Sequence, residues 1–310
     1  MGISARGTFP LAGTGISAQS GGVSNVLGLW RRLPVVVRAV VIGLLVATAG
    51  TGPWALLGAA NLSYGSAVPW AVLPTALYLW LFWRYVKGAG WPRSTADARR
   101  ENSRVRPLRD DVWSAALIAG VVGIAAVLLF QNVLGRMVTL PQQRDFDPSR
   151  YPIATVAAWA VMSALVAGVA EEVAFRGYLQ RPIERRHGPW VAILVAGVLF
   201  GLLHFTHREV TWVLLPFYLG VAAVYGMLAY LTDSTLPGIV LHAGGNMFGA
   251  IGLFATGRSE WGASQEGGAL IWDTGPDASF WLSLALAGGA AAAAVWAYRE
   301  LARVARTAPR

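Results

Sequence analysis

Long apolar runs alternate with short polar segments along most of the chain, and this pattern constrains the fold more than any other feature. The chain is 55% hydrophobic and only 13% charged, whereas soluble domains carry about 25% charged residues. An apolar α-helix of about 20 residues spans the hydrocarbon of a bilayer and satisfies its own backbone hydrogen bonds there. The sequence therefore predicts an all-α fold, a polytopic transmembrane helix bundle.

Eight runs are predicted to span the membrane. They cover residues 39–57, 67–85, 112–133, a fourth run that starts near residue 153 and leads into Glu171, and residues 190–205, 212–231, 236–254 and 278–296. We expect Gly52-Pro53 to bend or end the first span. His187-Gly188-Pro189 is predicted to be a helix stop and restart between the fourth and fifth spans.

The basic residues determine the predicted orientation. The net charge is +9, but the basic side chains lie in short segments between apolar runs. This distribution argues against a nucleic-acid partner and follows the positive-inside rule. We therefore expect an integral protein of the plasma (cytoplasmic) membrane with both termini cytoplasmic. The arginines between residues 99 and 109 are predicted to form a lipid-facing charge cluster that sets topology.

Two adjacent carboxylates and an arginine stand at the end of the fourth run. Glu171, Glu172 and Arg176 follow residues 153–170, which carry no charged side chain. Ionised groups near hydrocarbon cost several kcal/mol each unless they are paired, so they indicate a functional site. Glu172 and Arg176 are four residues apart on a helix and are predicted to neutralise each other, which leaves Glu171 for chemistry.

Two later runs supply candidate partners for Glu171. Phe200 and His204 are four residues apart, as are His242 and Asn246, so each pair shares a helix face. Glu171 and His204 are each about sixteen residues from the turn at 187–188, so a continuous hairpin would place them at equal depth. The predicted site lies in the core of spans four to seven, with Glu171 as general base toward a water that His204 orients. His242 and Asn246 are predicted to donate hydrogen bonds to a developing oxyanion.

The three motifs together resemble the CPBP family, also called the ABI family. It comprises type II CAAX prenyl endopeptidases and related bacterial intramembrane proteases. The motifs are Glu171-Glu172-xxx-Arg176, Phe200-xxx-His204 and His242-xxx-Asn246. The resemblance covers roughly residues 152–255, and the other predicted spans lie outside it.

The resemblance implies an endopeptidase that cleaves a peptide or membrane-protein substrate, lipidated or not, at the lipid bilayer. Glu171 and His204 would activate water, while His242 and Asn246 would stabilise the tetrahedral intermediate. The supporting residues would be Glu172, Arg176 and Phe200. Both a glutamate-type mechanism and a metalloprotease remain open: a metal-dependent site would use Glu171, His204 and His242 to hold zinc. The chain has no cysteine, which excludes thiolate ligands and a cysteine nucleophile.

The predicted organisation has four parts. They are a flexible N-terminal tail (1–28), the first three transmembrane helices (29–151), the CAAX-protease-like core (152–255), and a loop, last helix and basic tail (256–310). Two other functions use the same polar residues: a non-proteolytic membrane scaffold or immunity factor, and a proton- or cation-coupled transporter. A transporter predicts broken helices in a repeated arrangement, and the sequence contains no such repeat.

Overall fold

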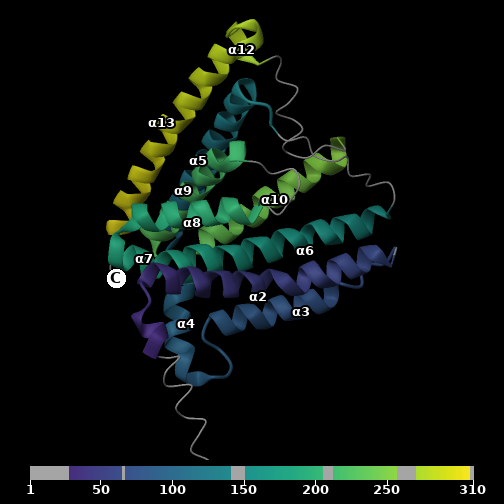
Figure 1. Ribbon diagram of the computed structural model, residues 1–310, viewed down its shortest axis with the longest axis vertical. Helices are drawn as coiled ribbons and strands as arrows, with labels where there is room; N and C mark the ends of the chain where they lie inside the picture. The colour runs from purple at the N-terminus through teal and green to yellow at the C-terminus, as the bar shows by residue number, and fades with distance from the viewer. Residues whose placement is uncertain (1–27, 65–66, 141–150, 205–211, 257–269, 308–310) are drawn as a thin grey trace, which may run out of the picture.

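The computed structural model describes residues 28–64, 67–140, 151–204, 212–256 and 270–307, with the backbone alone for residues 253–256. The predicted flexible tail and most of the acidic loop between residues 258 and 277 lie outside these ranges. The described residues are almost entirely helical and contain no strand, which confirms the predicted all-α class (Figure 1).

Successive long helices alternate in direction through the molecule (Figure 1). They are α2 (Val35–Ser63), α3 (Val72–Val86), α5 (Asp110–Met137), α6 (Ile153–Glu172), α8 (Pro189–His204), α9 (Leu215–Thr232), α10 (Leu236–Thr256) and α13 (Ala278–Arg306). The short elements between them are η1 (Arg93–Thr95), α4 (Ala96–Ser103), η3 (Val173–Leu179), α7 (Gln180–His187), η4 (Trp212–Leu214) and α12 (Ile271–Thr274).

Among the described residues, five helical segments are long and apolar enough to cross a membrane. They are Val35–Ser63, Asp110–Met137, Ile153–His187, Trp212–Thr232 and Ala278–Arg306. The shorter apolar helix Pro189–His204 is α8. Long apolar helices are therefore confirmed for part of the predicted set, and the count of eight spans stays a prediction.

Two local predictions about helix ends had different outcomes. α7 ends at His187, Gly188 has a φ of 84°, and α8 begins at Pro189, so the predicted stop and restart is confirmed. Gly52-Pro53 was predicted to bend or end the first span, and it does not end it, because α2 continues to Ser63. Proline removes a single N–H donor, and membrane helices tolerate this loss.

The prediction of a lipid-facing arginine cluster between residues 99 and 109 is wrong for two of its arginines, while Arg100, Arg106 and Arg109 are exposed. Arg99 and Arg104 are buried, at 4% and 0% exposure. Arg99 donates to the backbone carbonyls of Tyr85 and Pro92, each at 2.9 Å. Backbone carbonyls are strong hydrogen-bond acceptors, and their positions after a helix cannot be read from sequence patterns. Here they bind the Arg99 guanidinium inside the protein, so it does not face lipid.

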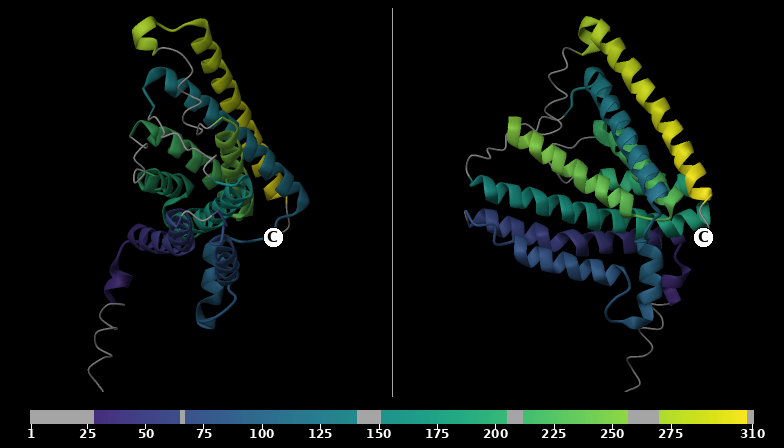
Figure 2. Two further views of the ribbon diagram at one scale, coloured as in Figure 1. Left: turned by 90° about the vertical axis from the view of Figure 1, so that its right-hand side faces the viewer. Right: turned by 180° about the vertical axis from the view of Figure 1, so that it is seen from behind.

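The helices converge at one end of the molecule and spread apart toward the other (Figures 1 and 2). The start of α2, the short helices α4 and α7 and the end of α13 all lie at the convergent end (Figure 1). α6 packs along α10 and α2, α8 along α9, and α5 along α13. The largest buried cluster joins η3, α7, α8 and α9, and includes Phe175, Leu179, Phe200 and Tyr218.

α6, η3 and α7 form one rod that changes its helical pitch in the middle. η3 is a π-helix that begins directly after Glu172 and contains Arg176. A π-helix is rare, and when it occurs inside an α-helix it often coincides with a functional site. The first polar motif therefore lies at the junction of the α-helical and π-helical segments.

Candidate active site

His242 lies between the two adjacent carboxylates of the first motif. Its Nδ1 is 2.9 Å from Glu172 Oε1, and its Nε2 is 3.8 Å from Glu171 Oε2. The first distance is a hydrogen bond, in which the ring N–H donates to the carboxylate. The second is too long for one and matches a contact that a water can bridge. The third motif thus meets the first across the interface of α6 and α10.

Glu172 and Arg176 form the ion pair that their spacing predicts. Arg176 Nη1 is 3.2 Å from Glu172 Oε1, and both side chains are 1% exposed. The Arg176 guanidinium also lies over the rings of Phe200 and Tyr225, at 5.1 and 5.3 Å from their centroids. Aromatic faces attract a desolvated guanidinium, so these rings help to hold the arginine beside Glu172.

Glycines let α10 approach this carboxylate closely. A Cβ on Gly238 would lie 2.7 Å from Glu172 Oε2, closer than any side chain tolerates. On α6, a Cβ on Gly168 would lie 2.9 Å from both Ala243 Cβ and the Ile239 carbonyl oxygen. Small residues on both helices therefore bring the backbones together, as is common in membrane helix pairs, and set the distance from Glu172 to His242.

His204 occupies the last turn of α8 and is half-buried. Its Nδ1 is 2.7 Å from the Phe200 carbonyl oxygen, and the Phe200 ring lies 4.6 Å from the imidazole centroid. A carbonyl oxygen only accepts, so Nδ1 carries the hydrogen in this bond and Nε2 has a lone pair for a neutral ring. The predicted wall of Phe200 beside His204 is present.

Two tyrosines of α9 stack on the two motif histidines, and the sequence analysis did not identify them. Tyr218 lies 4.6 Å from the His204 ring at an interplanar angle of 31°, and Tyr225 lies 5.4 Å from the His242 ring at 8°. Both tyrosines are 4% exposed. Their seven-residue separation places them two turns apart on one helix face. That spacing within an apolar run was the signal available in the sequence.

Glu171 and Asn246 are more accessible than Glu172 and His242. The Glu171 side chain is 21% exposed, and Asn246 is exposed one turn beyond His242 along α10. Glu172 in contrast is fully buried. The two neighbouring carboxylates therefore have different surroundings: Glu172 is held by Arg176 and His242, while Glu171 lies at the accessible edge of the group.

The hairpin argument for pairing Glu171 with His204 does not describe how the helices pack. α6 lies against α10 and α2, and α8 lies against α9 and α7, so α6 and α8 do not pack along one another. Equal distance from a turn places residues side by side only if the two helices stay in contact, and the π-helical segment and neighbouring helices prevent that here. The structure places Glu171 beside His242, and its pairing with His204 through a water stays a prediction.

The predicted zinc ligands do not form a metal site among the described residues. Within this part of the chain, no three His, Asp or Glu side chains are grouped so that they could hold a metal ion. His242 uses Nδ1 for Glu172, and His204 uses Nδ1 for the Phe200 carbonyl. These bonds leave Nε2 of each ring as the nitrogen that would ligate a metal, but Glu171, His204 and His242 are not grouped as a metal site among the described residues.

The comparison with known families agrees with the motifs. Residues 153–248 match the family model described as type II CAAX prenyl endopeptidase Rce1-like. The match includes every residue predicted for the site and confirms the resemblance to the CPBP family. No curated protein and no solved structure was found to match the chain.

Proposed function

We propose that the protein is an intramembrane endopeptidase of the CAAX-protease type, which hydrolyses a peptide bond in a membrane-associated or lipidated polypeptide. The observation that carries this proposal is the position of His242, between buried Glu172 and accessible Glu171. Ionisable groups in an apolar helix interface are expensive, and function is the usual reason for keeping them. The Rce1-like family match over the same residues supports the reaction class.

The proposed reaction begins with water beside Glu171. The Glu171 carboxylate takes a proton from the water while the water oxygen attacks the scissile carbonyl carbon. Nε2 of His204 accepts a hydrogen bond from the other O–H of that water and orients it. The attack produces a tetrahedral intermediate with a negatively charged oxygen, and Glu171 then gives its proton to the leaving nitrogen as the C–N bond breaks. The products are a carboxylic acid and an amine, so one water is consumed for each bond cleaved.

His242 and Asn246 are proposed to stabilise the oxyanion. Nδ1–H of His242 donates to Glu172, so Nε2 can donate only when the ring is protonated. Its two ring nitrogens face carboxylates, Glu172 at 2.9 Å and Glu171 at 3.8 Å. The Asn246 amide, one helical turn away, supplies a second donor. Glu172 and Arg176 orient the imidazole and take no part in bond making.

We place the protein in the cytoplasmic membrane with both termini on the cytoplasmic side. The start of α2, the basic helices α4 and α7 and the end of α13 lie at the same end of the bundle (Figure 1). Arginines at that end support the orientation by the positive-inside rule. The Glu172–His242 contact joins the end of α6 to the first half of α10, on the cytoplasmic side of the bundle in this orientation.

The function is tested with purified protein in lipid vesicles. Quenched fluorescent peptides with an apolar segment are offered with and without a C-terminal farnesyl group, and cleavage is mapped by mass spectrometry. We expect cleavage by the wild type and none by Glu171→Gln. Glu101→Gln, which changes an exposed carboxylate on α4, is the matched control and should cleave normally. Equal cleavage by wild type and Glu171→Gln would contradict the proposal. Comparing the peptide with and without the farnesyl group decides whether lipidation contributes to substrate recognition.

A further inference from the structure

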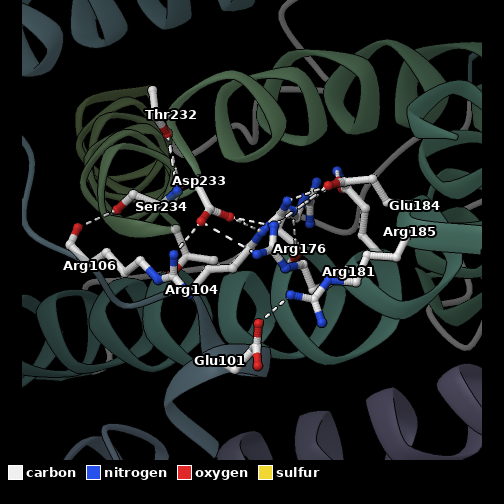
Figure 3. Close-up of polar contacts among 12 residues, drawn as sticks. Glu101, Arg104, Arg106, Arg176, Arg181, Glu184, Arg185, Thr232, Asp233 and Ser234 are labelled. Atoms are coloured by element: carbon white, nitrogen blue, oxygen red, sulfur yellow. Dashed lines mark hydrogen bonds and ion pairs between the residues drawn. The ribbon is translucent and has the colours of Figure 1, made fainter. Parts of the chain in front are cut away.

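Arg104 is a fully buried arginine at the convergent end of the molecule, outside the motif residues. It follows α4, is 0% exposed and bonds to three separate elements. Nη1 and Nη2 donate to the Glu184 carboxylate on α7 at 3.0 and 2.5 Å, and Nε donates to Asp233 at 3.2 Å. Nη1 also lies 3.4 Å from the backbone oxygen of Arg176. Figure 3 shows Arg104 among these groups.

The backbone around Arg104 is also tied to the start of α10. The Thr235 N–H donates to the Arg104 carbonyl at 2.9 Å, and the Thr235 hydroxyl donates to the Ser103 carbonyl at 3.0 Å. Ser234 Oγ donates to the Arg106 carbonyl at 2.7 Å. The segment of residues 103–106 therefore bonds on one side to η3 and α7, and on the other to the turn that begins α10. We call this segment with its partners Glu184 and Asp233 the Arg104 clasp.

The segment before the clasp lies directly on the π-helix. A Cβ on Gly177 would be 2.6 Å from the Asn102 carbonyl oxygen, so only glycine allows α4 to pack this closely against η3. A π-helix is less stable than an α-helix, and surrounding contacts must favour it for it to persist. The end of α4 and the hydrogen bond from Arg104 to the Arg176 carbonyl are such contacts.

Two residues of the clasp adopt left-handed backbone conformations. Arg104 has a φ of 54° and Asp233 a φ of 51°. Such values are uncommon for residues other than glycine, and for a long side chain such as arginine they are unfavourable. Strained conformations persist only where surrounding contacts determine them, and they concentrate near functional sites. The buried bonds of Arg104 and the three arginines around Asp233 provide those contacts (Figure 3).

We propose that Arg104 is a positioning residue for the active site. It fixes η3, whose first turn follows Glu172 and which contains Arg176, against the start of α10, whose second turn carries His242. The clasp thereby sets the contact between Glu172 and His242 although Arg104 touches neither side chain. The catalytic part of this inference rests on the proposed function, while the structural part does not.

A second buried arginine provides a matched control. Arg99 lies on α4 itself and is 4% exposed. Its guanidinium donates to carbonyls of the α3–α4 connection, at Tyr85, Ala89, Gly90 and Pro92, and to the hydroxyl of Thr95. None of these five partners belongs to η3 or α10. Arg99→Lys therefore removes a buried guanidinium fork near the clasp without removing a bond to the elements that carry the site.

The experiment compares Arg104→Lys with Arg99→Lys in full-length protein in nanodiscs. Lysine keeps the charge and loses the forked geometry that reaches several acceptors at once. Hydrogen–deuterium exchange is measured over residues 173–179 and 236–242, and kcat and KM are measured for the peptide cleaved by the wild type. For Arg104→Lys we expect faster exchange in both segments and a kcat lowered about 10- to 100-fold, because small misplacements of catalytic groups have effects of this size. KM should change little.

The outcomes separate a positioning role from a general structural one. Faster exchange and lower kcat in Arg104→Lys, with both quantities near wild type in Arg99→Lys, support the proposal. Wild-type behaviour of Arg104→Lys overturns it, as do equal losses in both variants. If Arg104→Lys fails to fold, Asp233→Asn replaces it, because asparagine accepts the left-handed backbone and removes the charge that faces Arg104. If the wild type cleaves no peptide, the proposed function fails, and the exchange data alone decide whether the clasp positions η3 and α10.

Discussion

Two helix pairs of this protein pack closely but differ in what they bury. α5 and α13 meet along apolar and small residues such as Ala116, Ala119 and Ala297. An ion pair between Arg136 and Asp277 joins the end of α5 to the start of α13. α6 and α10 also use small residues, but Glu172 and His242 meet inside their interface. The first pair joins its helices through apolar and small residues along the middle of the interface and places its charged contact at the helix ends. The ionisable groups of the second pair therefore require another explanation, and catalysis provides it.

The largest expected effect in this comparison is the loss of cleavage in Glu171→Gln. General-base catalysis contributes roughly 10²- to 10⁴-fold, so kcat should fall by about that factor. Thermal stability should stay near wild type, because Glu171 lies at the accessible edge of the site and is 3.8 Å from His242, too far for a hydrogen bond. The measurements are peptide cleavage in vesicles and the unfolding midpoint in detergent. A large loss of stability would make Glu171 a structural residue and remove the contrast with Glu172.

Glu172→Ala should destabilise the protein more than any change at the α5–α13 interface. It leaves the Arg176 guanidinium buried without its carboxylate, and breaking a buried pair in this way typically costs about 3–5 kcal/mol. The expected result is a clear drop in the unfolding midpoint, measured by thermal denaturation in detergent. The comparison variant is Ala297→Gly in the α5–α13 interface. This substitution removes one buried methyl group and leaves no charged group without its partner. Equal decreases of the unfolding midpoint in the two variants would mean that the buried Glu172–Arg176 pair contributes no more to stability than an apolar contact.

Tyr225 is expected to act through its ring and not through its hydroxyl. Tyr225→Phe keeps the stacked face against His242 and should retain most activity, whereas Tyr225→Leu should lower kcat by about tenfold because the imidazole loses its packing partner. Tyr298→Leu is the control on α13, where the hydroxyl donates to the Val224 carbonyl at 2.8 Å. It should change stability without a matching change in kcat. A Phe variant as impaired as the Leu variant would assign the role to the hydroxyl instead.

Asp277 should give the smallest effect, and one that depends on pH. Hydrogen bonds from Arg136, the Phe280 N–H and Ser279 hold the pKa of this exposed carboxyl well below its usual range. Because the pKa is lower in the folded state, the stabilisation is present above the ordinary aspartate pKa and is lost as the pH falls through the folded value. Wild type should therefore unfold at a slightly higher temperature than Asp277→Asn at neutral pH, and the difference should shrink in acid. A difference that does not vary with pH would contradict this account.

The sequence predicts the local features of the site better than its long-range contacts. The Glu172–Arg176 pair, the Phe200–His204 pair and the turn at Gly188 depend on spacing within a few residues, and helix geometry determines them. The contact of α6 with α10 depends on glycines such as Gly168 and Gly238. The spacing of residues in the sequence does not specify which helix packs against these glycines. The burial of Arg104 was not predicted either, because charge patterning does not distinguish an arginine at the membrane surface from one enclosed by three elements.

The most direct test of the central claim is a comparison of membrane peptides from cells that contain either the wild-type protein or Glu171→Gln, analysed by mass spectrometry. It presumes no particular substrate. The account predicts that new peptide ends, generated in or beside apolar segments, accumulate with the wild type and are absent with Glu171→Gln, while both proteins are present at equal levels in the membrane. Identical peptide ends in the two samples would contradict the assignment of Glu171 and His242 to peptide-bond hydrolysis.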